Sequence, residues 1–321
     1  MNQLLKTAGQ RVVQAQKACQ KVQRLQSSRV FVGLDLSVES PAWCAVRIPA
    51  PTPTSASTPQ ALAWPHVYMG FISQRKREAK KGGFGLGAYR TWTHPRSQRQ
   101  WTLYRHQLPP NLASAHADQP PPLARYHKLH HLREAFKYFL DHVVRVQPAE
   151  QLHVGIEHYA YSAGDSRGAS VLYELGGMIR HEVWSRPNLQ QCREMAPTQV
   201  KRVFSGMGGA SKELMHEAFG QLFDVSAHDE DRTLNTSMQL RELLSCRIDQ
   251  HPWEDMVDAF AVLCTNVSLT YCPAEVERAQ ELEQKLEQRK RMVKRKRETS
   301  VQTSETTTVL AGKNCFKHPK L

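Results

Sequence analysis

Our prediction of the fold starts from one apolar segment, Arg29-Val30-Phe31-Val32-Gly33-Leu34-Asp35-Leu36-Ser37. Branched and aromatic apolar residues lead through one glycine to an acid, which is typical of a strand buried on both faces. An ionised Asp in such a strand costs several kcal/mol unless it is paired or bound to a cation. The stretch therefore predicts a central strand with a functional carboxylate, Asp35, near its end.

Two later stretches carry further acids. Leu152-His153-Val154-Gly155-Ile156-Glu157 is a second apolar strand that ends in an acid. Residues 253–263 have a helical pattern, and a spacing of three places Asp255 and Asp258 on one helix face. Carboxylate oxygens are the ligands that hard divalent cations prefer. We therefore predict a metal cage whose ligands are Asp35, Glu157, Asp255 and Asp258.

Composition limits the partners. The 321 residues include 43 Lys and Arg against 30 Asp and Glu, a net charge of +13. So basic a chain favours a polyanionic partner, nucleic acid first and a membrane surface second. No apolar run approaches the roughly 18 residues of a membrane span, so no membrane segment is expected. The 7 cysteines include no C-x-x-C pair, which predicts free thiols in a reducing, intracellular compartment and no zinc site.

The order of the apolar segments predicts an α/β domain. Residues 49–63 are rich in Pro, Ser, Thr and Ala and are expected to form a surface loop. Three strands ahead of the first helix indicate a mixed sheet that opens with a meander and is flanked by helices. The expected strands are 30–37, 43–48, 67–72 and 152–157, and the expected helices are 129–146 and 171–184.

The two ends of the chain differ from this domain in composition. Residues 1–29 contain basic residues and no acid, and are expected to form a basic helix, with a mitochondrial presequence as the alternative. Residues 271–297 are expected to form a charged helix that ends in a basic cluster at 289–297, either a nuclear signal or a nucleic-acid patch. Residues 298–321 are expected to be a disordered tail.

A basic and aromatic insert is expected at about residues 74–126. Basic side chains hold phosphates and aromatic rings stack on exposed bases, so this mixture suits distorted or single-stranded nucleic acid. The alternative is a solvated loop whose rings pack locally. The predicted DNA contacts of the insert are Arg75, Lys76, Arg77, Lys80, Lys81, Tyr89, Arg90, Trp92, Arg96, Arg99, Trp101, Tyr104 and Arg105.

A second basic segment surrounds a glycine turn. Pro197 is at an expected first helical position, and the turn Gly206-Met207-Gly208-Gly209 separates this helix from the next. A phosphate loop of the Walker type is excluded, because Ser211 and Glu213 occupy the positions beside the lysine. A helix start with free N–H groups and a lysine still suits a backbone phosphate. The predicted phosphate contacts are Lys201, Arg202 and Lys212, and the alternative is surface lysines beside a tight turn.

Together, these elements resemble the RuvC family of Holliday-junction resolvases, which have an RNase H-like fold. The family's first acid ends a strand as G-[IL]-D, its second ends a strand as I-E, and its last two form D-x-x-D-A on a helix. Between them the family carries V-K, a G-x-G turn and A-x-K. The matching positions here are Gly33-Leu34-Asp35, Ile156-Glu157, Asp255 to Ala259, Val200-Lys201, Gly206-Met207-Gly208 and Ala210-Ser211-Lys212. Asp35 is followed by Leu-Ser, which looks closer to the phage and viral branch.

The resemblance covers roughly residues 30–270. It implies a nuclease domain with a five-stranded mixed sheet and the activity of a crossover junction endodeoxyribonuclease. It implies two Mg²⁺ or Mn²⁺ ions per active site, with Lys212 and Lys201 on the scissile phosphate, and a homodimer that makes paired symmetric nicks in a four-way DNA junction. No small-molecule cofactor is expected. We expect the nucleus, or the cytoplasm of a phage- or virus-infected cell, in preference to the mitochondrion.

Three alternatives stay open at this point. An RNase H or a strand transferase also uses acids at strand ends, but lacks the lysine segment. A sugar-kinase or actin-like ATPase would need a second glycine-rich phosphate turn, which the residues after Glu157 do not supply. The third alternative is a junction-binding protein without catalysis.

Overall fold

A computed structural model shows the arrangement of most of the central part of the chain. It describes residues 28–37, 41–49, 66–73, 89–93, 100–107, 121–158, 166–223, 252–274 and a few positions between 276 and 292. The predicted basic helix before residue 28, the 49–63 loop apart from its first residue, and the tail at 298–321 lie outside these residues, so they stay predictions.

The described residues form one mixed sheet of 7 strands in the order β4-β5-β3-β2-β1-β6-β7. β1 pairs antiparallel with β2 and parallel with β6. β2 and β3 are antiparallel, whereas β6 and β7 are parallel. The strands are β1 (Arg29–Asp35), β2 (Ala42–Ile48), β3 (His66–Ser73), β4 (Tyr89–Thr93), β5 (Gln100–Gln107), β6 (Gln151–Glu157) and β7 (Leu189–Met195).

The predicted α/β class, the opening meander and the RNase H-like arrangement are confirmed by this topology. The predicted count of five strands is wrong. β4 and β5 come from the insert and extend the sheet beyond β3, with β5 parallel to β3 and β4 antiparallel to β5. Part of the insert is therefore sheet, because its alternating residues pair with an edge that β3 would otherwise leave open.

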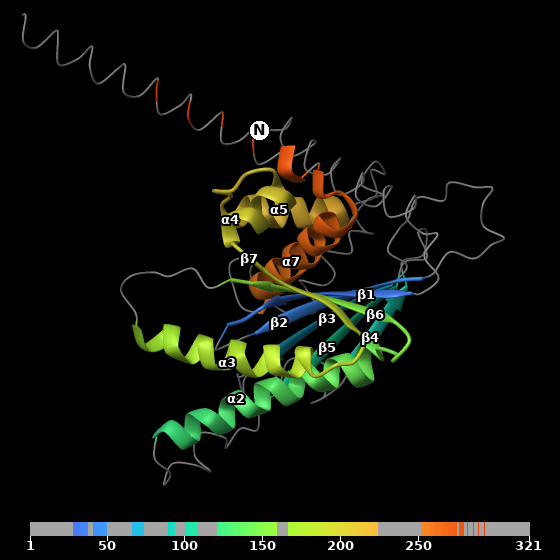
Figure 1. The fold of residues 1–321 in the computed structure, drawn as a ribbon, viewed down its shortest axis with the longest axis vertical. Helices are drawn as coiled ribbons and strands as arrows, with labels where there is room; N and C mark the ends of the chain where they lie inside the picture. The colour runs from blue at the N-terminus through green and yellow to red at the C-terminus, as the bar shows by residue number, and fades with distance from the viewer. Residues whose placement is uncertain are drawn as a thin grey trace, which may run out of the picture. The chain divides into compact units, whose positions relative to one another are not determined.

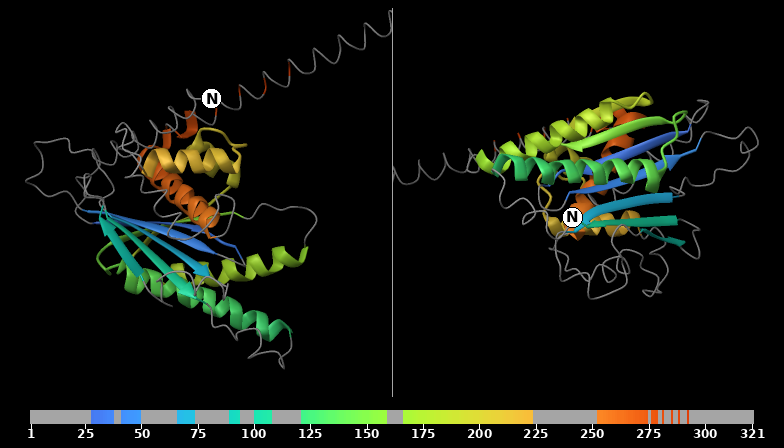
Figure 2. Two further views of the ribbon diagram at one scale, coloured as in Figure 1. Left: turned by 180° about the vertical axis from the view of Figure 1, so that it is seen from behind. Right: turned by 90° about the horizontal axis from the view of Figure 1, so that it is seen from below.

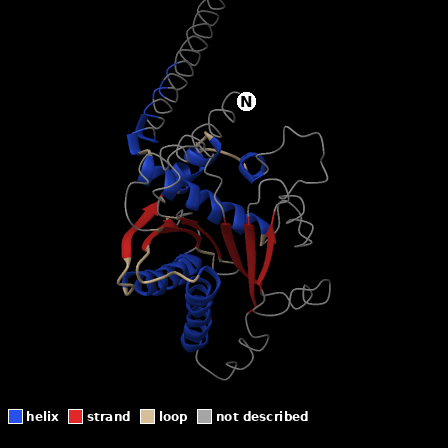
Figure 3. Cartoon of the chain, turned by 90° about the vertical axis from the view of Figure 1, so that its right-hand side faces the viewer, coloured by secondary structure: helices blue, strands red, loops and turns tan. Residues whose placement is uncertain are grey.

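Helices cover both faces of the sheet (Figure 1). Figure 2 and Figure 3 show the same layering from other sides. One face is covered by α2 (Pro121–Tyr138), the π-helix η3 (Phe139–Val144) and α3 (Ser166–Trp184). The other face carries α4 (Pro197–Ser205), α5 (Lys212–Phe223) and α7 (Trp253–Tyr271). The predicted helix at 129–146 thus begins earlier, at Pro121, where a proline is tolerated because the first turn needs no N–H donor.

Helix α7 packs directly on β1 and β6. A Cβ atom at Gly33 would lie 2.2 Å from the backbone nitrogen of Leu263, so only glycine permits this approach. The buried amide of Asn266 donates to the carbonyl of Val32 at 3.4 Å and to that of His153 at 3.2 Å. The helix is therefore tied to both strands that carry the predicted acids.

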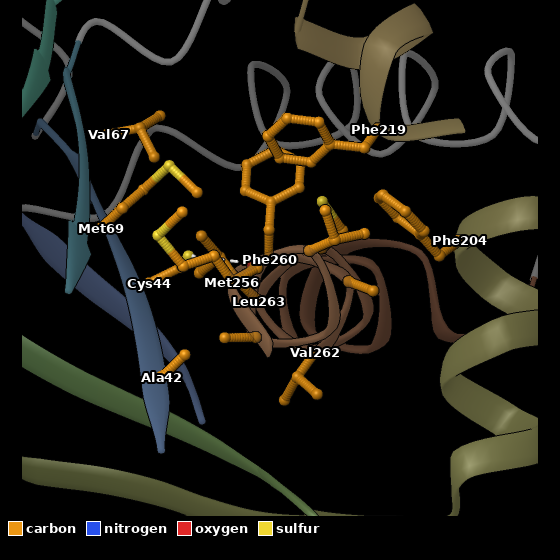
Figure 4. Packing of buried hydrophobic residues seen from close by; sticks show 14 of the residues in the cluster. Ala42, Cys44, Val67, Met69, Phe204, Phe219, Met256, Phe260, Val262 and Leu263 are labelled. Atoms are coloured by element: carbon orange, nitrogen blue, oxygen red, sulfur yellow. Dashed lines mark hydrogen bonds between the residues drawn. The ribbon is translucent and has the colours of Figure 1, made fainter. Parts of the chain in front are cut away.

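The core on the α7 side combines small, flexible and aromatic side chains of the sheet, among them Cys44, Met69 and Phe31. Figure 4 shows Cys44 and Met69 facing Met256 and Phe260 of α7. Phe219 of α5 meets Phe260 edge to face, with ring centroids 5.1 Å apart. This packing holds α4 and α5 beside the first turn of α7, where the acids lie.

The chain divides into a unit of residues 1–273 and a second unit of residues 274–321. The described residues of the second unit, between 274 and 292, are helical. None of the helices in the described residues has the length and apolarity that crossing a membrane requires.

Candidate active site

Acidic and basic side chains meet in a cavity of about 330 Å³ where β1 and β6 end. The two strands are parallel neighbours, with Leu34 opposite Ile156, so the acids that follow these residues reach the same edge of the sheet. Alternation along each strand places Gly33 and Asp35 on the α7 side. The charged and imidazole side chains of the wall are Asp35, Glu157, His158, Lys201, Lys212, His216, Glu254 and Asp258.

The carboxylates are crowded enough to hold protons. Burial, and then the charge of Glu157 and of Asp258, raises the pKa of Asp35 well above its usual value. Burial and the charge of Asp258 raise the pKa of Glu157 to about 7. Burial and the charges of Glu254 and Asp255 raise the pKa of Asp258 to about 7. Without a cation, these acids repel one another strongly.

The residues present fit a hard divalent cation in chemistry, although their side chains are not closed around one point. Within the residues that the structure describes, no group of three or more His, Cys, Asp or Glu side chains has the arrangement of a preformed metal site. Oxygen donors that raise one another's pKa nevertheless gain most from a bound cation, because it relieves their repulsion. The acid cluster therefore suits Mg²⁺ or Mn²⁺ better than it suits a neutral ligand.

Three of the four predicted acids lie on the cavity wall, and the fourth does not. Asp255 is 4% exposed and is absent from the wall, while its neighbour Glu254 lines the cavity. Glu254 and Asp258 are four residues apart, so they share a helix face. Asp255 still acts on the site through its charge, which raises the pKa of Asp35 and Asp258. Its role as a ligand stays a prediction.

Both predicted lysines line the cavity opposite these acids. Lys212 begins α5, and its Nζ is ion-paired with a carboxylate oxygen of Glu254. Lys201 lies on α4, and its charge lowers the pKa of Glu157 and Asp258. Arg202, the next residue on α4, is not part of the wall. The sequence analysis did not include Glu254 among the site residues. Its position four residues before Asp258, on the same helix face, could have identified it.

Comparisons with known proteins do not assign this chain to a family. No protein-family profile matches its sequence. No curated protein matches it either. Among solved structures, it is similar to RuvC from Thermus thermophilus, with 12% identity and a TM-score of 0.36 over 75% of this chain and 95% of that chain.

Two further solved structures are similar to the same degree. One is T. thermophilus RuvC in complex with a Holliday junction substrate, with 11% identity and a TM-score of 0.35 over 75% of this chain and 94% of that chain. The other is the yeast mitochondrial Holliday junction resolvase Ydc2, with 9% identity and a TM-score of 0.35 over 84% of this chain and 89% of that chain. Values this low establish neither family nor activity. The expected closeness to the phage and viral branch stays a prediction.

The structure corrects three of the DNA contacts that we predicted in the insert. Trp101 is 4% exposed and Tyr104 is 1% exposed, because alternate residues of β5 enter the two core layers. Tyr104 stacks on Tyr138 with ring centroids 5.6 Å apart. Neither ring can stack on an opened base, so the alternative of local packing holds for both. Arg105 is 7% exposed, which keeps its guanidinium from a phosphate.

The other predicted contacts of the insert are not tested. Tyr89, Arg90 and Trp92 belong to β4, of which the structure describes only the backbone at these positions. Seven further residues lie outside the described part of the chain: Arg75, Lys76, Arg77, Lys80, Lys81, Arg96 and Arg99.

The crowded acids predict that stability of the metal-free protein falls as pH rises. Glu157 and Asp258 have a pKa of about 7 in the folded chain, against ordinary values of 4.5 and 3.8. The folded state therefore binds more protons than the unfolded state between these values, and raising the pH through this range costs stability. We expect a lower free energy of unfolding in EDTA at about pH 8 than at about pH 5.

Urea denaturation of the full chain measures this difference. Asp258→Asn should make the free energy of unfolding less dependent on pH, because one of the titrating groups is gone. Glu174→Gln, an exposed acid on α3, is the matched control and should leave the dependence unchanged. Equal slopes for Asp258→Asn and the wild type would contradict the proposed crowding.

Proposed function

We propose that this chain is a metal-dependent endonuclease that resolves four-way DNA junctions. The observation that carries the proposal is the cavity itself, in which crowded carboxylates from β1, β6 and α7 face lysines from α4 and α5. Metal-dependent hydrolysis of a phosphodiester requires carboxylates that bind cations and basic groups that bind the phosphate. The cavity brings both kinds of group together. The net charge of +13 supports a nucleic acid as the substrate.

The acids would hold two divalent cations. We assign the ligands to Asp35, Glu157 and Asp258, with Glu254 or Asp255 completing the set. Bound Mg²⁺ or Mn²⁺ supplies the Lewis acidity that hydrolysis at neutral pH needs. The fold places the carboxylates at one edge of the sheet. It also shields Asp255, which is 4% exposed, from bulk water.

The lysines would bind the scissile phosphate. Lys212 is held by Glu254, so its ammonium has a defined position before the substrate arrives. The positive charge of Lys201 reaches the buried acids, since it lowers the pKa of both Glu157 and Asp258. A lysine that is already oriented stabilises developing charge without further reorganisation.

Loss of Lys212 should reduce cutting far more than binding. We expect Lys212→Ala to lower the single-turnover cleavage rate by about a hundredfold, the scale for one charge stabiliser. Glu254→Gln should also reduce cutting, because it removes the ion pair that positions the lysine and one candidate ligand of the cations. Glu217→Gln, an exposed acid on the same helix as Lys212, is the control and should cut at the wild-type rate. Normal cutting by Lys212→Ala with weaker binding would reassign this lysine to a positioning contact.

A labelled four-way junction tests the function directly. The full chain should nick it symmetrically in Mg²⁺ and leave it intact in EDTA, and should leave a linear duplex of the same sequence uncut. Binding without cutting would favour the non-catalytic alternative, and cutting of an RNA–DNA hybrid in preference to the junction would favour an RNase H. Paired nicks need two sites, so we also propose a homodimer, which light scattering in solution would detect.

A further inference from the structure

A histidine that the sequence did not single out lines the same cavity. His216 lies on α5, four residues after Lys212, so the two side chains share a helix face. Both belong to the cavity wall, opposite Glu254 and Asp258 of α7. His216 is half-buried, and it is therefore held by the fold while still bordering the cavity.

The protonation of this imidazole is set by a tryptophan. Trp253 Nε1 lies 2.8 Å from His216 Nδ1, and the two ring planes are within 14° of parallel. An indole N–H can only donate, so Nδ1 must be the acceptor and cannot carry a proton. The ring proton of His216 therefore lies on Nε2, and the imidazole is neutral while this hydrogen bond exists.

The tryptophan is itself fixed by the core. Trp253 is 3% exposed and meets Phe219 edge to face, with ring centroids 5.2 Å apart. It is the first residue of α7 and directly precedes Glu254. The same helix start thus positions the acid that holds Lys212 and the donor that orients His216.

We propose that His216 is a substrate-binding residue, whose Nε2–H donates to an oxygen of the scissile phosphodiester. This inference rests on the proposed function. Ionised carboxylates cannot donate to a phosphate. Lys201 and Lys212 act on the acids through their charges, and a third cation would compete with the divalent ions for these acids. The neutral Nε2–H of His216 can donate to the phosphate without competing with the divalent ions for the acids. The hydrogen bond from Trp253 keeps His216 in this tautomer.

The tautomer is measurable without any activity. In ¹⁵N spectra of the full chain with labelled histidines, the His216 signals, identified by their loss in His216→Gln, should show the Nε2–H tautomer. Trp253→Phe keeps an aromatic ring in the core but removes the donor, so it should shift these signals toward a mixture of tautomers. The Nδ1–H tautomer in the wild type would overturn the proposal.

Two substitutions of His216 separate donation from packing. We expect His216→Phe, which keeps a ring but no donor, to lower kcat/KM for junction cutting about ten- to a hundredfold, the range for a hydrogen bond to a charged group. His216→Gln, whose amide can still donate, should stay within a few-fold of the wild type. His181→Phe, an exposed histidine on α3, should have no effect.

The outcomes distinguish this inference from the proposed function. A wild type that cuts no nucleic acid in Mg²⁺ refutes the function, and the phosphate contact with it. A wild type that cuts, with His216→Phe at the same rate, refutes only the role of His216. Equal losses in the Phe and Gln variants would also overturn the proposal, because an amide that can donate would then restore nothing. A larger loss in Gln than in Phe would overturn it too, because it would show that the ring is needed for packing and not for donation.

Discussion

Asp35→Asn is expected to abolish junction cutting and to leave junction binding equal or tighter. Asp35 lies at the centre of the acid cluster, since the charges of Glu157, Asp258, Asp255 and Glu254 all raise its pKa. Replacing it with an amide removes the carboxylate that we propose as the central ligand of the cations. We expect the cleavage rate to fall by at least about a thousandfold, the upper end for losing one electrostatic stabiliser.

Binding should respond in the opposite direction, because a carboxylate that faces phosphates is lost. Single-turnover cutting of a labelled junction in Mg²⁺, and binding of the same junction in EDTA, measure the two effects. Asp141→Asn is the matched control, since Asp141 pairs with Arg186 on the other face of the sheet. A wild-type cutting rate for Asp35→Asn would show that the proposed cage is wrong.

Gly33→Ala is expected to cause a large loss of stability. The added Cβ would lie 2.2 Å from the nitrogen of Leu263 and 2.4 Å from the carbonyl oxygen of Ala259, both in the backbone of α7. A helix backbone cannot yield as a flexible side chain does, so α7 must move away from β1. Overpacking of this kind costs about 1–3 kcal/mol, and more where backbone is displaced. The shift would also move Asp258 away from Asp35 and reduce cutting.

Gly177→Ala is the matched control for this change. Gly177 lies within α3, and a Cβ there would have no atom within 4 Å. Replacing glycine by alanine inside a helix stabilises it by up to about 1 kcal/mol. Urea unfolding should therefore move the two midpoints in opposite directions. A midpoint for Gly33→Ala at or above that of the wild type would contradict the close packing of α7 on β1.

Local patterns were sufficient for the strands and helices that carry the acids. The apolar run of β1 is confirmed as a buried strand, because its alternate residues enter the two core layers on opposite faces of the sheet. The same holds for β6, whose pairing with β1 brings Glu157 beside Asp35. The lysines could also be placed, since a proline at a helix start and a glycine turn fix the ends of α4. Residue type and spacing thus predicted which elements bring acids and lysines to the cavity.

Tertiary contacts decided which side chains face the cavity. Helical periodicity left open which acids of α7 line the cavity. In the packed structure, Glu254 lines the wall and Asp255 is buried. In the insert, the aromatic composition was compatible with either base stacking or core packing. Because β5 pairs with β3, the side chains of Trp101 and Tyr104 are buried in the core.

The positions of the acids and lysines, and the elements that carry them, follow from patterns among near neighbours in the chain. The partners of those side chains depend on packing between elements that are far apart in the chain. Trp253 and His216 are 37 residues apart, and no local pattern links an indole to an imidazole at that separation. Their hydrogen bond exists because α5 and α7 pack through Phe219 and Phe260, a contact that depends on the whole core.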